Sequence, residues 1–398
     1  LVKRARAAKR DYILMGRVLP MTGPVAPFSD SSPWLDNKAV AEINRDGGLY
    51  IEEYGKKVPF KIKLVDSESN GTKAAELASR LILKDKVDIM YVSCTPETVN
   101  PVCGQCERHK VPCIGSDLPQ EMFLAGGPYH WSFHVGPKVA DFMASYIQMW
   151  EDVPTNKILG LLAANEVDGV AFAKGAGDNL PGLGYKVIDP GRFPTGNRDF
   201  SSIIDTFKRA KVEVLFGNLA PPDFTTVWRQ CFRLGWLPEI CSIGRALLFP
   251  SAVEAIGGNL GLGTSTEGIW HRNYGFKSSL GGYTTMEICD AFEAESGKQW
   301  TAPIGQNYVG FEIMADALKR VKTLDREKLR NALASTDLHT LCGRIKMDKD
   351  KSGIVPTGGI QWVKGKKFPF DQVLVSNGNF PDLPVQTKLV PVTMFHKK

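Results

Sequence analysis

Apolar stretches of strand length alternate with amphipathic stretches of helix length along most of the chain. Residues 12–20 form a nearly continuous apolar run, which is typical of a buried strand. Residues 33–46 and 138–150 carry apolar side chains three and four positions apart, which predicts helices with one buried face. A further helix is predicted over residues 72–84, with Thr72 as the residue that caps its N-terminus.

This alternation runs along the chain twice. The first set ends with a strand predicted at 111–116, and the second continues from the helix at 138–150 to a helix at 223–234. Strands that alternate with helices of this length build parallel sheets through right-handed crossovers. The predicted fold class is therefore α/β, with two doubly wound parallel-sheet lobes. Ligands of such sheets bind beyond the carboxyl ends of the strands, so two facing lobes would enclose a cleft.

The composition is that of an ordinary globular protein. The chain has 398 residues, of which 43% are hydrophobic and 23% charged, and this length favours two domains. The net charge of +6 comes almost entirely from residues 1–10, which hold five lysines and arginines and no acid. We expect this segment to be a basic, disordered tail. The near-neutral remainder gives no support to a nucleic-acid partner.

The chain carries no catalytic or metal-site motif that we can identify. Cys103 and Cys106 form a C-x-x-C pair, but no second cysteine or histidine pair follows at zinc spacing. We interpret the eight cysteines as structural thiols or a local disulfide, with thiol redox chemistry at Cys103 and Cys106 as the enzymatic alternative. Nucleophile-elbow, zinc-protease and phosphate-loop motifs are missing. We therefore expect no enzyme activity, no cofactor and no metal.

Export is suggested by what the sequence does not contain. No apolar run reaches the ~18 residues that a membrane span needs. The chain begins at Leu1 rather than Met and holds no apolar signal-peptide core. We expect a processed or truncated form from which an export signal has been removed.

Several motifs occur in an order that resembles a known family. They are PMTGPVAPFSD at 20–30, AEINRDGGL at 41–49, DFSSIIDTFKRAKVEVLFGN at 199–218 and GIVPTGGIQWVKGKK at 353–367. Together they resemble the type I periplasmic binding proteins, and in particular the leucine/isoleucine/valine-binding branch, over residues 11–398. The glycine-rich loop after the first strand suits the family's function, because it leaves backbone N–H groups free to meet a ligand.

The resemblance implies two lobes joined by a three-segment hinge. The chain would cross between them near residues 134–138, 268–274 and 356–360. The expected parts are a tail at 1–10, an N-terminal lobe of 11–135 plus 272–357, and a C-terminal lobe of 136–271 plus 358–398.

The resemblance also implies the extracytoplasmic solute-binding component of an ABC uptake transporter. Such a protein is a monomer that closes on a small molecule and delivers it to a membrane permease. It would lie in the periplasm or outside the cell, with or without a lipid anchor. The alternative is the ligand-sensing domain of a receptor, which uses the same fold. No transmembrane or DNA-binding segment accompanies the lobes here, which favours transport.

Loops of the predicted N-terminal lobe carry candidate ligand contacts. By resemblance, Thr95 stands where the family has a hydroxyl residue that binds the ligand carboxylate, and Cys94 lies beside it. Ser116 and Asp117 lie in the next loop, which usually supplies a second hydroxyl and a backbone contact. Phe28 lies in the loop after the first strand, where it would cover the ligand or pack on a neighbouring tryptophan. Each of these residues could instead be an ordinary turn or cap residue.

Loops of the predicted C-terminal lobe change the expected ligand. Asp168 stands where the family has a ligand-facing tyrosine, and Leu219 or Ala220 stands where it has another. Arg245 stands where the family has the acid that binds an ammonium group. Pro119 replaces a hydroxyl residue of the amino-acid pattern. A guanidinium binds carboxylates in a bidentate manner. We therefore predict a small carboxylate ligand, aromatic or aliphatic, with branched-chain or other amino acids and amides such as urea as alternatives. Arg245 in a purely structural ion pair is the competing interpretation.

Overall fold

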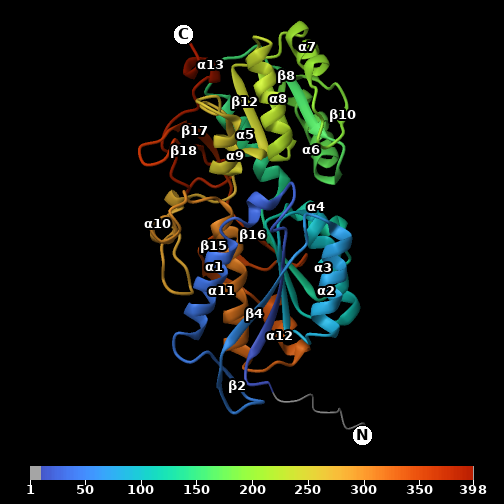
Figure 1. Cartoon of the computed structure of the whole chain (residues 1–398), viewed down its shortest axis with the longest axis vertical. Coiled ribbons are helices and arrows are strands. Elements are labelled where there is room, and N and C mark those ends of the chain that lie inside the picture. Colours follow the sequence, from blue (N-terminus) through green and yellow to red (C-terminus); the bar gives the residue numbers. More distant parts are fainter. Residues whose placement is uncertain (1–9, 398) are drawn as a thin grey trace.

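The computed structural model describes residues 10–397 and consists of two α/β lobes stacked along the long axis of the molecule (Figure 1). The predicted basic tail at 1–10 lies outside the described residues, apart from Arg10. That residue is ordered, since its Nη2 lies 2.9 Å from Asp88 Oδ1. Within residues 10–397, no helix combines the length and the apolar character that crossing a membrane requires.

The first lobe is built on a six-stranded, fully parallel sheet. In spatial order its strands are β16 (Ser352–Ile354), β7 (Ser132–Gly136), β6 (Cys113–Ser116), β5 (Ile89–Ser93), β1 (Ile13–Leu19) and β4 (Phe60–Asp66). Its helices are α1 (Ser32–Asn44), α2 (Gly71–Leu83), α3 (Pro96–His109), α4 (Gln120–Ala125), α10 (Thr285–Ser296), α11 (Pro303–Val321) and α12 (Arg326–Ala334). Two antiparallel pairs join it: β2 (Leu49–Ile51) with β3 (Lys56–Val58), and β14 (Asp337–Thr340) with β15 (Gly343–Lys346).

The second lobe is built on an eight-stranded mixed sheet. Its parallel part comprises β9 (Lys186–Ile188), β10 (Arg192–Phe193), β8 (Ile158–Ala164), β11 (Val214–Leu219), β12 (Ile240–Arg245) and β13 (Ser265–Gly268). The antiparallel strands β17 (Gly358–Lys364) and β18 (Phe370–Ser376) complete it. Its helices are α5 (Val139–Trp150), α6 (Val167–Asn179), α7 (Ser201–Arg209), α8 (Pro221–Arg233), α9 (Pro250–Ile256) and α13 (Val392–Phe395).

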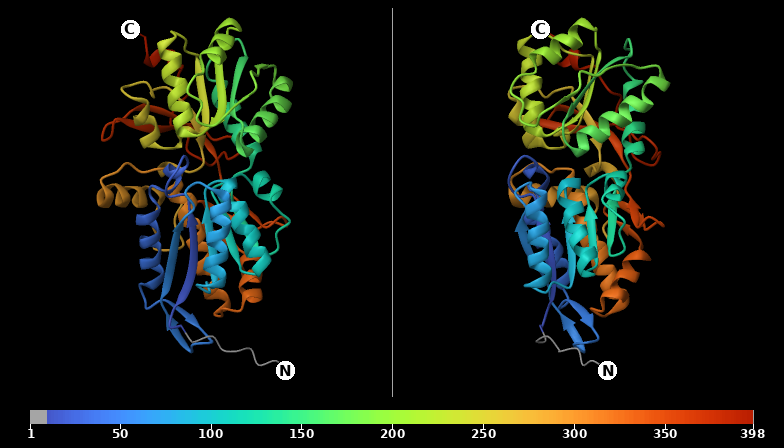
Figure 2. Two further views of the ribbon diagram at one scale, coloured as in Figure 1. Left: turned by 45° about the vertical axis from the view of Figure 1, so that its right-hand side comes forward. Right: turned by 90° about the vertical axis from the view of Figure 1, so that its right-hand side faces the viewer.

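The chain passes between the two sheets at three places, as the sequence predicts. It leaves the first sheet after β7 and enters the second lobe with α5, returns after β13, and crosses again between β16 and β17. All three connections run along the junction that is visible in both views of Figure 2. The predicted class, two doubly wound parallel-sheet lobes with three connections, is confirmed. The assignment of each residue to a lobe remains the prediction made from the sequence.

Two local predictions were wrong. Asn70, not Thr72, caps α2, because the Asn70 side chain accepts a hydrogen bond from Lys73 N at 2.9 Å. The sequence of residues 185–193 also predicts a single strand, which the structure breaks into β9 and β10. Its break falls at Asp189–Gly191, where Pro190 donates no backbone hydrogen bond and Gly191 adopts a positive φ of 94°.

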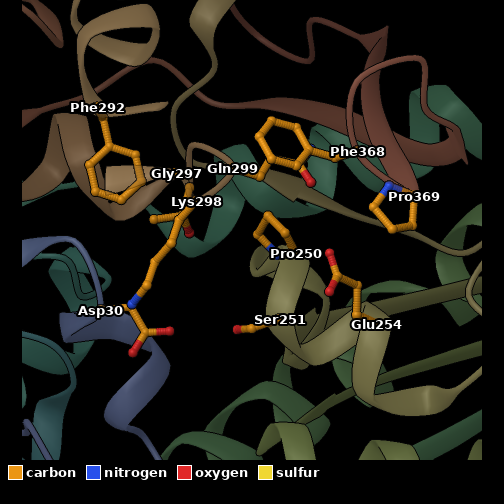
Figure 3. Close-up of a pocket in the computed structure, with 11 residues that line it drawn as sticks. Asp30, Pro250, Ser251, Glu254, Phe292, Gly297, Lys298, Gln299, Phe368 and Pro369 are labelled. Carbon is orange, nitrogen blue, oxygen red and sulfur yellow. The ribbon is translucent and has the colours of Figure 1, made fainter. Parts of the chain in front are cut away.

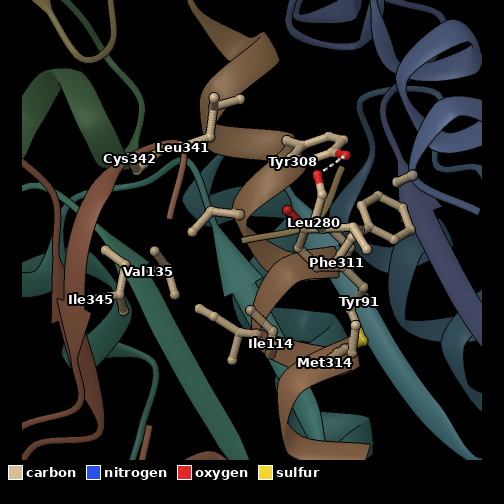
Figure 4. Close-up of a cluster of buried hydrophobic side chains, with 14 of the residues drawn as sticks. Tyr91, Ile114, Val135, Leu280, Tyr308, Phe311, Met314, Leu341, Cys342 and Ile345 are labelled. Atoms are coloured by element: carbon tan, nitrogen blue, oxygen red, sulfur yellow. Dashed lines mark hydrogen bonds between the residues drawn. The ribbon is translucent and has the colours of Figure 1, made fainter. Parts of the chain in front are cut away.

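The core of the first lobe forms where α11 packs on the sheet (Figure 4). Phe311 meets Tyr91 edge to face, with ring centroids 5.5 Å apart. Helix and strand approach this closely because residue 310 is glycine: a Cβ there would lie 2.2 Å from the Tyr91 ring. The hydroxyl of Tyr91 is also fixed, because it donates a hydrogen bond to Asn307 O at 2.8 Å. Strand β5, which leads into the loop at Cys94, is therefore held against α11 by packing and by a hydrogen bond.

The cysteines and two of the tryptophans lie in the interior of the protein. All eight cysteines are free and buried, so the local disulfide considered above does not form. Trp228 lies in the core of the second lobe, and its Nε1 donates to Leu260 O. Trp270 and His271, near the second connection, are also buried and bond to the backbone of Leu341 and Gln372.

Candidate functional site

The carboxyl ends of the parallel strands of both lobes face one another across a cleft. The cleft has two compartments that meet at Thr95 and Arg245, one residue from each lobe. The inner compartment, with a cavity volume of about 40 Å³, is lined by Phe28, Thr95, Pro96, Asp117, Leu118, Pro119, Pro137, Phe142, Asp168, Asn218, Arg245, Leu248, Glu267 and Ile269. The outer one, with a cavity volume of about 150 Å³, is lined by Pro24, Val25, Ser69, Thr95, Glu97, Ala164, Glu166, Thr195, Ala220, Asp223 and Arg245.

The first lobe contributes a wall of turns at the ends of β5 and β6. Thr95 stands at the N-cap of α3, a helix of 14 residues whose partial positive charge faces the cleft. Cys94 and Asp117 both adopt positive φ, 59° and 63°, although neither is glycine. Such backbone strain is tolerated only where the surroundings enforce it, and it gathers at ligand sites. Cys94 Sγ lies 3.2 Å from Asp117 Oδ2, so the two turns are joined.

Phe28 forms an apolar bridge between the lobes. It belongs to the short 3-10 turn η1 (Ala26–Ser29) and is buried, with 3% of its surface exposed. Its ring meets the ring of Phe249 in the second lobe edge to face, with centroids 4.7 Å apart. Trp34, the tryptophan considered above, packs instead on Phe292. Phe28 therefore both lines the inner compartment and joins the lobes.

The second lobe contributes a wall of charges centred on Arg245. This residue ends β12 with φ 61° and ψ −56°, and only 8% of it is exposed. Its Nη1 lies 2.7 Å from Glu166 Oε1 and 3.1 Å from Asp168 Oδ2. Its backbone N–H donates to Glu267 Oε1 at 3.1 Å. The guanidinium is thus buried and partly committed to carboxylates of its own lobe, before any ligand is considered.

Burial reduces the negative charge of these carboxyls. Burial raises the pKa of Asp117 to about 7, against the opposing effect of its bond with Cys94. Burial likewise raises the pKa of Glu166 to about 7 and that of Asp168 to about 6, although Arg245 lowers both. Glu97 behaves differently: burial acts to raise its pKa, but Arg245 and hydrogen bonds hold it below the usual value. Near neutral pH the cleft therefore contains carboxyls that can donate a proton in a hydrogen bond.

Unpartnered polar atoms show what a ligand must supply. Among the described residues, the buried acceptor atoms of the cleft that lack a hydrogen-bond partner include Asp168 Oδ1, Asn218 Oδ1 and Asp223 Oδ2. One buried donor, Arg245 Nε, also lacks a partner. Leaving such groups unsatisfied costs about 1–3 kcal/mol each. The cleft therefore favours a ligand with N–H or O–H groups together with an acceptor for Arg245.

The structure brings five of the eight candidate residues to the cleft surface: Phe28, Thr95, Asp117, Asp168 and Arg245. The other three lie behind it. Cys94 is fully buried against Asp117, and Ser116 is fully buried with its hydroxyl 2.9 Å from that of Tyr91. Leu219 points into the core of the second lobe, and its neighbours Asn218 and Ala220 line the cleft instead.

Sequence analysis missed seven polar residues of the cleft: Ser69, Glu97, Glu166, Thr195, Asn218, Asp223 and Glu267. Glu97 and Glu166 lie two positions from residues that were chosen, Thr95 and Asp168. Asn218 directly precedes Leu219, and strand alternation would have separated the two had the facing side been known. Glu267 is the last residue but one of β13, and the position of an acid near the end of a parallel strand was the signal that could have identified it.

Within residues 10–397, no group of three or more histidine, cysteine, aspartate or glutamate side chains is placed to hold a metal ion. In the cleft, Glu166 and Asp168 pair with Arg245, and Asp117 contacts Cys94. No cysteine or serine nucleophile with an adjacent base is among the residues that line the cleft. Its arrangement suits binding of a small molecule.

Comparison with known proteins agrees with this geometry. Residues 13–367 match the sequence model of a family described as periplasmic binding protein. A Leu/Ile/Val-binding protein homologue of Brucella abortus is 22% identical over 384 residues, covering 89% of this chain and 90% of the relative.

Two solved structures share the fold and have bound ligands. One is the branched-chain amino acid transporter substrate-binding protein of Streptococcus pneumoniae in complex with isoleucine, at a TM-score of 0.73 and 19% identity, covering 91% of this chain and 99% of that one. The other is a solute-binding protein of an ABC transporter from Rhodopseudomonas palustris with 3,4-dihydroxybenzoic acid, at a TM-score of 0.72 and 18% identity, covering 94% and 99%.

Proposed function

Because the chain belongs to the periplasmic binding protein family, in its Leu/Ile/Val-binding branch, we propose that it binds a small hydroxylated carboxylate in the cleft between its lobes. The family consists of extracytoplasmic solute-binding components of ABC transporters, for branched-chain amino acids or related ligands. The proposal concerns which related ligand this cleft accepts. Delivery to a membrane permease by a monomer, with or without a lipid anchor, is part of the same proposal.

The observation that carries the proposal is the imbalance of unpartnered atoms in the cleft. Three acceptors, Asp168 Oδ1, Asn218 Oδ1 and Asp223 Oδ2, and one donor, Arg245 Nε, are buried without a partner among the described residues. A ligand with O–H or N–H groups at one end would satisfy acceptors such as Asn218 Oδ1 and Asp168 Oδ1. A carboxylate at its other end would accept from Arg245 and lie near the N-terminus of α3.

The apolar part of the cleft favours an aromatic body. Phe28, Phe142, Leu248 and Ile269 line the inner compartment. A ring placed among them would bury apolar surface and have aromatic edges to meet. The Rhodopseudomonas structure contains a ligand of this kind, 3,4-dihydroxybenzoic acid.

An α-amino acid is the second candidate, and one observation favours it. Asp168 Oδ1 is a buried carboxylate oxygen without a hydrogen-bond partner among the described residues, and an ammonium group would satisfy it. The Streptococcus structure contains isoleucine. Against this candidate, Arg245 lies within the same group of side chains, and it would repel an ammonium group.

The proposal is tested by calorimetric titration of protein that has been unfolded, dialysed and refolded to remove any carried ligand. The panel is 3,4-dihydroxybenzoate, benzoate, catechol and isoleucine. We expect 3,4-dihydroxybenzoate to bind most tightly, because only it offers both hydroxyl donors and a carboxylate to an aromatic-lined cleft. A ligand at 100 times its Kd should also stabilise the protein by about 2.7 kcal/mol.

The matched variants are Asn218→Ala in the cleft and Asn259→Ala, an exposed asparagine of the same lobe. Since Asn218 Oδ1 has no partner to lose, Asn218→Ala should weaken 3,4-dihydroxybenzoate binding about ten-fold, the value of one to two hydrogen bonds, with little change in stability. Asn259→Ala should change neither. Binding of isoleucine in preference to 3,4-dihydroxybenzoate would overturn the proposal in favour of the amino-acid candidate.

A further inference from the structure

A second pocket lies between the lobes, apart from the cleft (Figure 3). It has a cavity volume of about 420 Å³ and shares no lining residue with either compartment of the cleft. Its walls come from both lobes: Asp30, Phe292 and residues 297–301 from elements packed on the first, and α9 with the β17–β18 turn from the second. The pocket is therefore complete only when the lobes are arranged as they are here.

Two residues that line this pocket each carry a buried polar atom without a hydrogen-bond partner. Gln299 is 9% exposed and Thr301 is 5% exposed, and both line the pocket. Among the described residues, Gln299 Oε1 and Thr301 Oγ1 have no hydrogen-bond partner. The orientation of the Gln299 amide is determined by its other end, since Nε2 donates to Phe370 O at 3.0 Å. The atom left for the pocket is therefore an acceptor.

The acidic and basic side chains at the rim do not balance. Lys298 and Asp30 interact electrostatically, so the charges of this base and this acid offset each other. Glu254 also lines the pocket, and no ion pair involving its carboxylate is present among the described residues. Aromatic and proline side chains form the rest of the lining; they are Phe292, Pro250, Phe368 and Pro369 (Figure 3). The pocket therefore offers acceptors, one unpaired negative charge and apolar walls.

We propose that this pocket, between Glu254, Gln299 and Thr301, is a second binding site that accepts a small organic amine with an apolar body. An ammonium group provides three N–H donors. They match the Gln299 carbonyl, the Thr301 hydroxyl and the Glu254 carboxylate, and charge-assisted bonds of this kind are the stronger ones. The apolar body lies against Phe292 and Phe368, whose ring faces also attract a cation. This site does not depend on the ligand proposed for the cleft.

The test is calorimetric titration of the full chain with benzylamine, with benzyl alcohol and benzoate as probes of the same shape and different charge. We expect benzylamine to bind and the other two to bind at least ten-fold more weakly. Thr301→Val keeps the shape of the side chain and removes an atom that has no intramolecular bond, so the variant should fold and bind benzylamine about ten-fold more weakly. Glu254→Gln, at an exposed rim position, should have a similar effect.

Two controls separate this site from the cleft. Thr336→Val removes another buried hydroxyl that lacks a partner among the described residues but lies outside the pocket, and it should leave benzylamine affinity unchanged. Asn218→Ala alters the cleft and should also leave it unchanged. Benzylamine binding that is lost in Asn218→Ala and retained in Thr301→Val would move the amine to the cleft and overturn the proposal. Absence of benzylamine binding at millimolar concentration would overturn it as well, whatever the cleft binds.

Discussion

Among the described residues, each lobe has one buried arginine near the cleft, and the two arginines differ in what surrounds them. Arg17, on β1, is fully buried behind the wall of the first lobe. Its Nη2 donates to Asn307 Oδ1 at 2.6 Å, its Nε lies 3.4 Å from Asp36 Oδ2, and its guanidinium covers the Tyr91 ring at 3.9 Å. Arg245 lies at the surface of the opposite wall, among carboxyls that reach the cleft.

The comparison teaches that depth, rather than residue type, separates a structural cation from a candidate ligand contact. Arg17 lies one layer below the cleft, where its neighbours are the core of its own lobe. Arg245 ends a parallel strand, so its side chain projects into the space where ligands of such sheets bind. Each arginine can be removed separately, and the consequences should differ in size and in kind.

Removal of Arg17 should have the largest effect on stability. Arg17→Ala leaves Asp36, which is 4% exposed, without its cation and opens space beneath Tyr91. Breaking a buried pair in this way costs about 3–5 kcal/mol. Urea unfolding should show this loss in the free energy of unfolding. Arg344→Ala removes an arginine from an exposed pair with Asp337 and should leave the urea midpoint close to that of the wild type. Equal midpoints for the two variants would contradict the structural role of Arg17.

The next largest effect on stability should come from Asp117, the acid of the first wall. It should appear as a dependence of the free energy of unfolding on pH. Burial raises its pKa from 3.8 to about 7, so the folded protein retains a proton that the unfolded chain has released. Its contribution to stability is therefore present below about pH 4 and is lost as the pH rises through 7. The loss for this group is on the order of 4 kcal/mol.

Unfolding of Asp117→Asn at several pH values between 4 and 8 measures this contribution. The neutral amide does not titrate, so the fall in stability with rising pH should be smaller in the variant than in the wild type. Asp337→Asn, at an exposed position, should retain the wild-type slope. A slope unchanged in Asp117→Asn would mean that this carboxyl is ionised in the folded protein at neutral pH.

Removal of Arg245 should cost less stability than removal of Arg17. In Arg245→Ala the carboxyls left behind can take up protons, since the pKa values of Glu166 and Asp168 are already about 7 and about 6. We expect a loss on the order of 1–2 kcal/mol at pH 7. Affinity for 3,4-dihydroxybenzoate should fall at least ten-fold, measured by the same titration as above. A loss of stability equal to that of Arg17→Ala, with affinity retained, would assign Arg245 a structural role.

Hydrophobic patterning was sufficient to predict the lobes, because each amphipathic helix and apolar strand reports which of its faces is buried. The family motifs supported the same architecture and the three connections. Local hydrogen bonds were harder to predict. The cap of α2 moved to Asn70 because an asparagine and a threonine two residues apart are both suitable caps, and only the backbone geometry selects one.

The candidate site was predicted by loop rather than by side chain. Thr95, Asp117, Asp168 and Arg245 were found because the resemblance aligned their loops with ligand-binding loops of the family. Their partners were not found, since the contact between Arg245 and Glu166 joins positions 79 residues apart. The pairing gives Arg245 the ion pair of the competing interpretation, and its Nε is left for a ligand.

The sequence by itself determined the fold class, the repeated α/β order and the strand ends at which a ligand can be bound, because these depend on periodicities within single segments. The tertiary structure decided which side chains meet there. The faces of β11, the burial of Arg17, the carboxyls around Arg245 and the unpartnered atoms of both pockets all depend on residues that are distant in sequence. Burial and hydrogen bonding are properties of the assembled lobes, so no local pattern in the chain could express them.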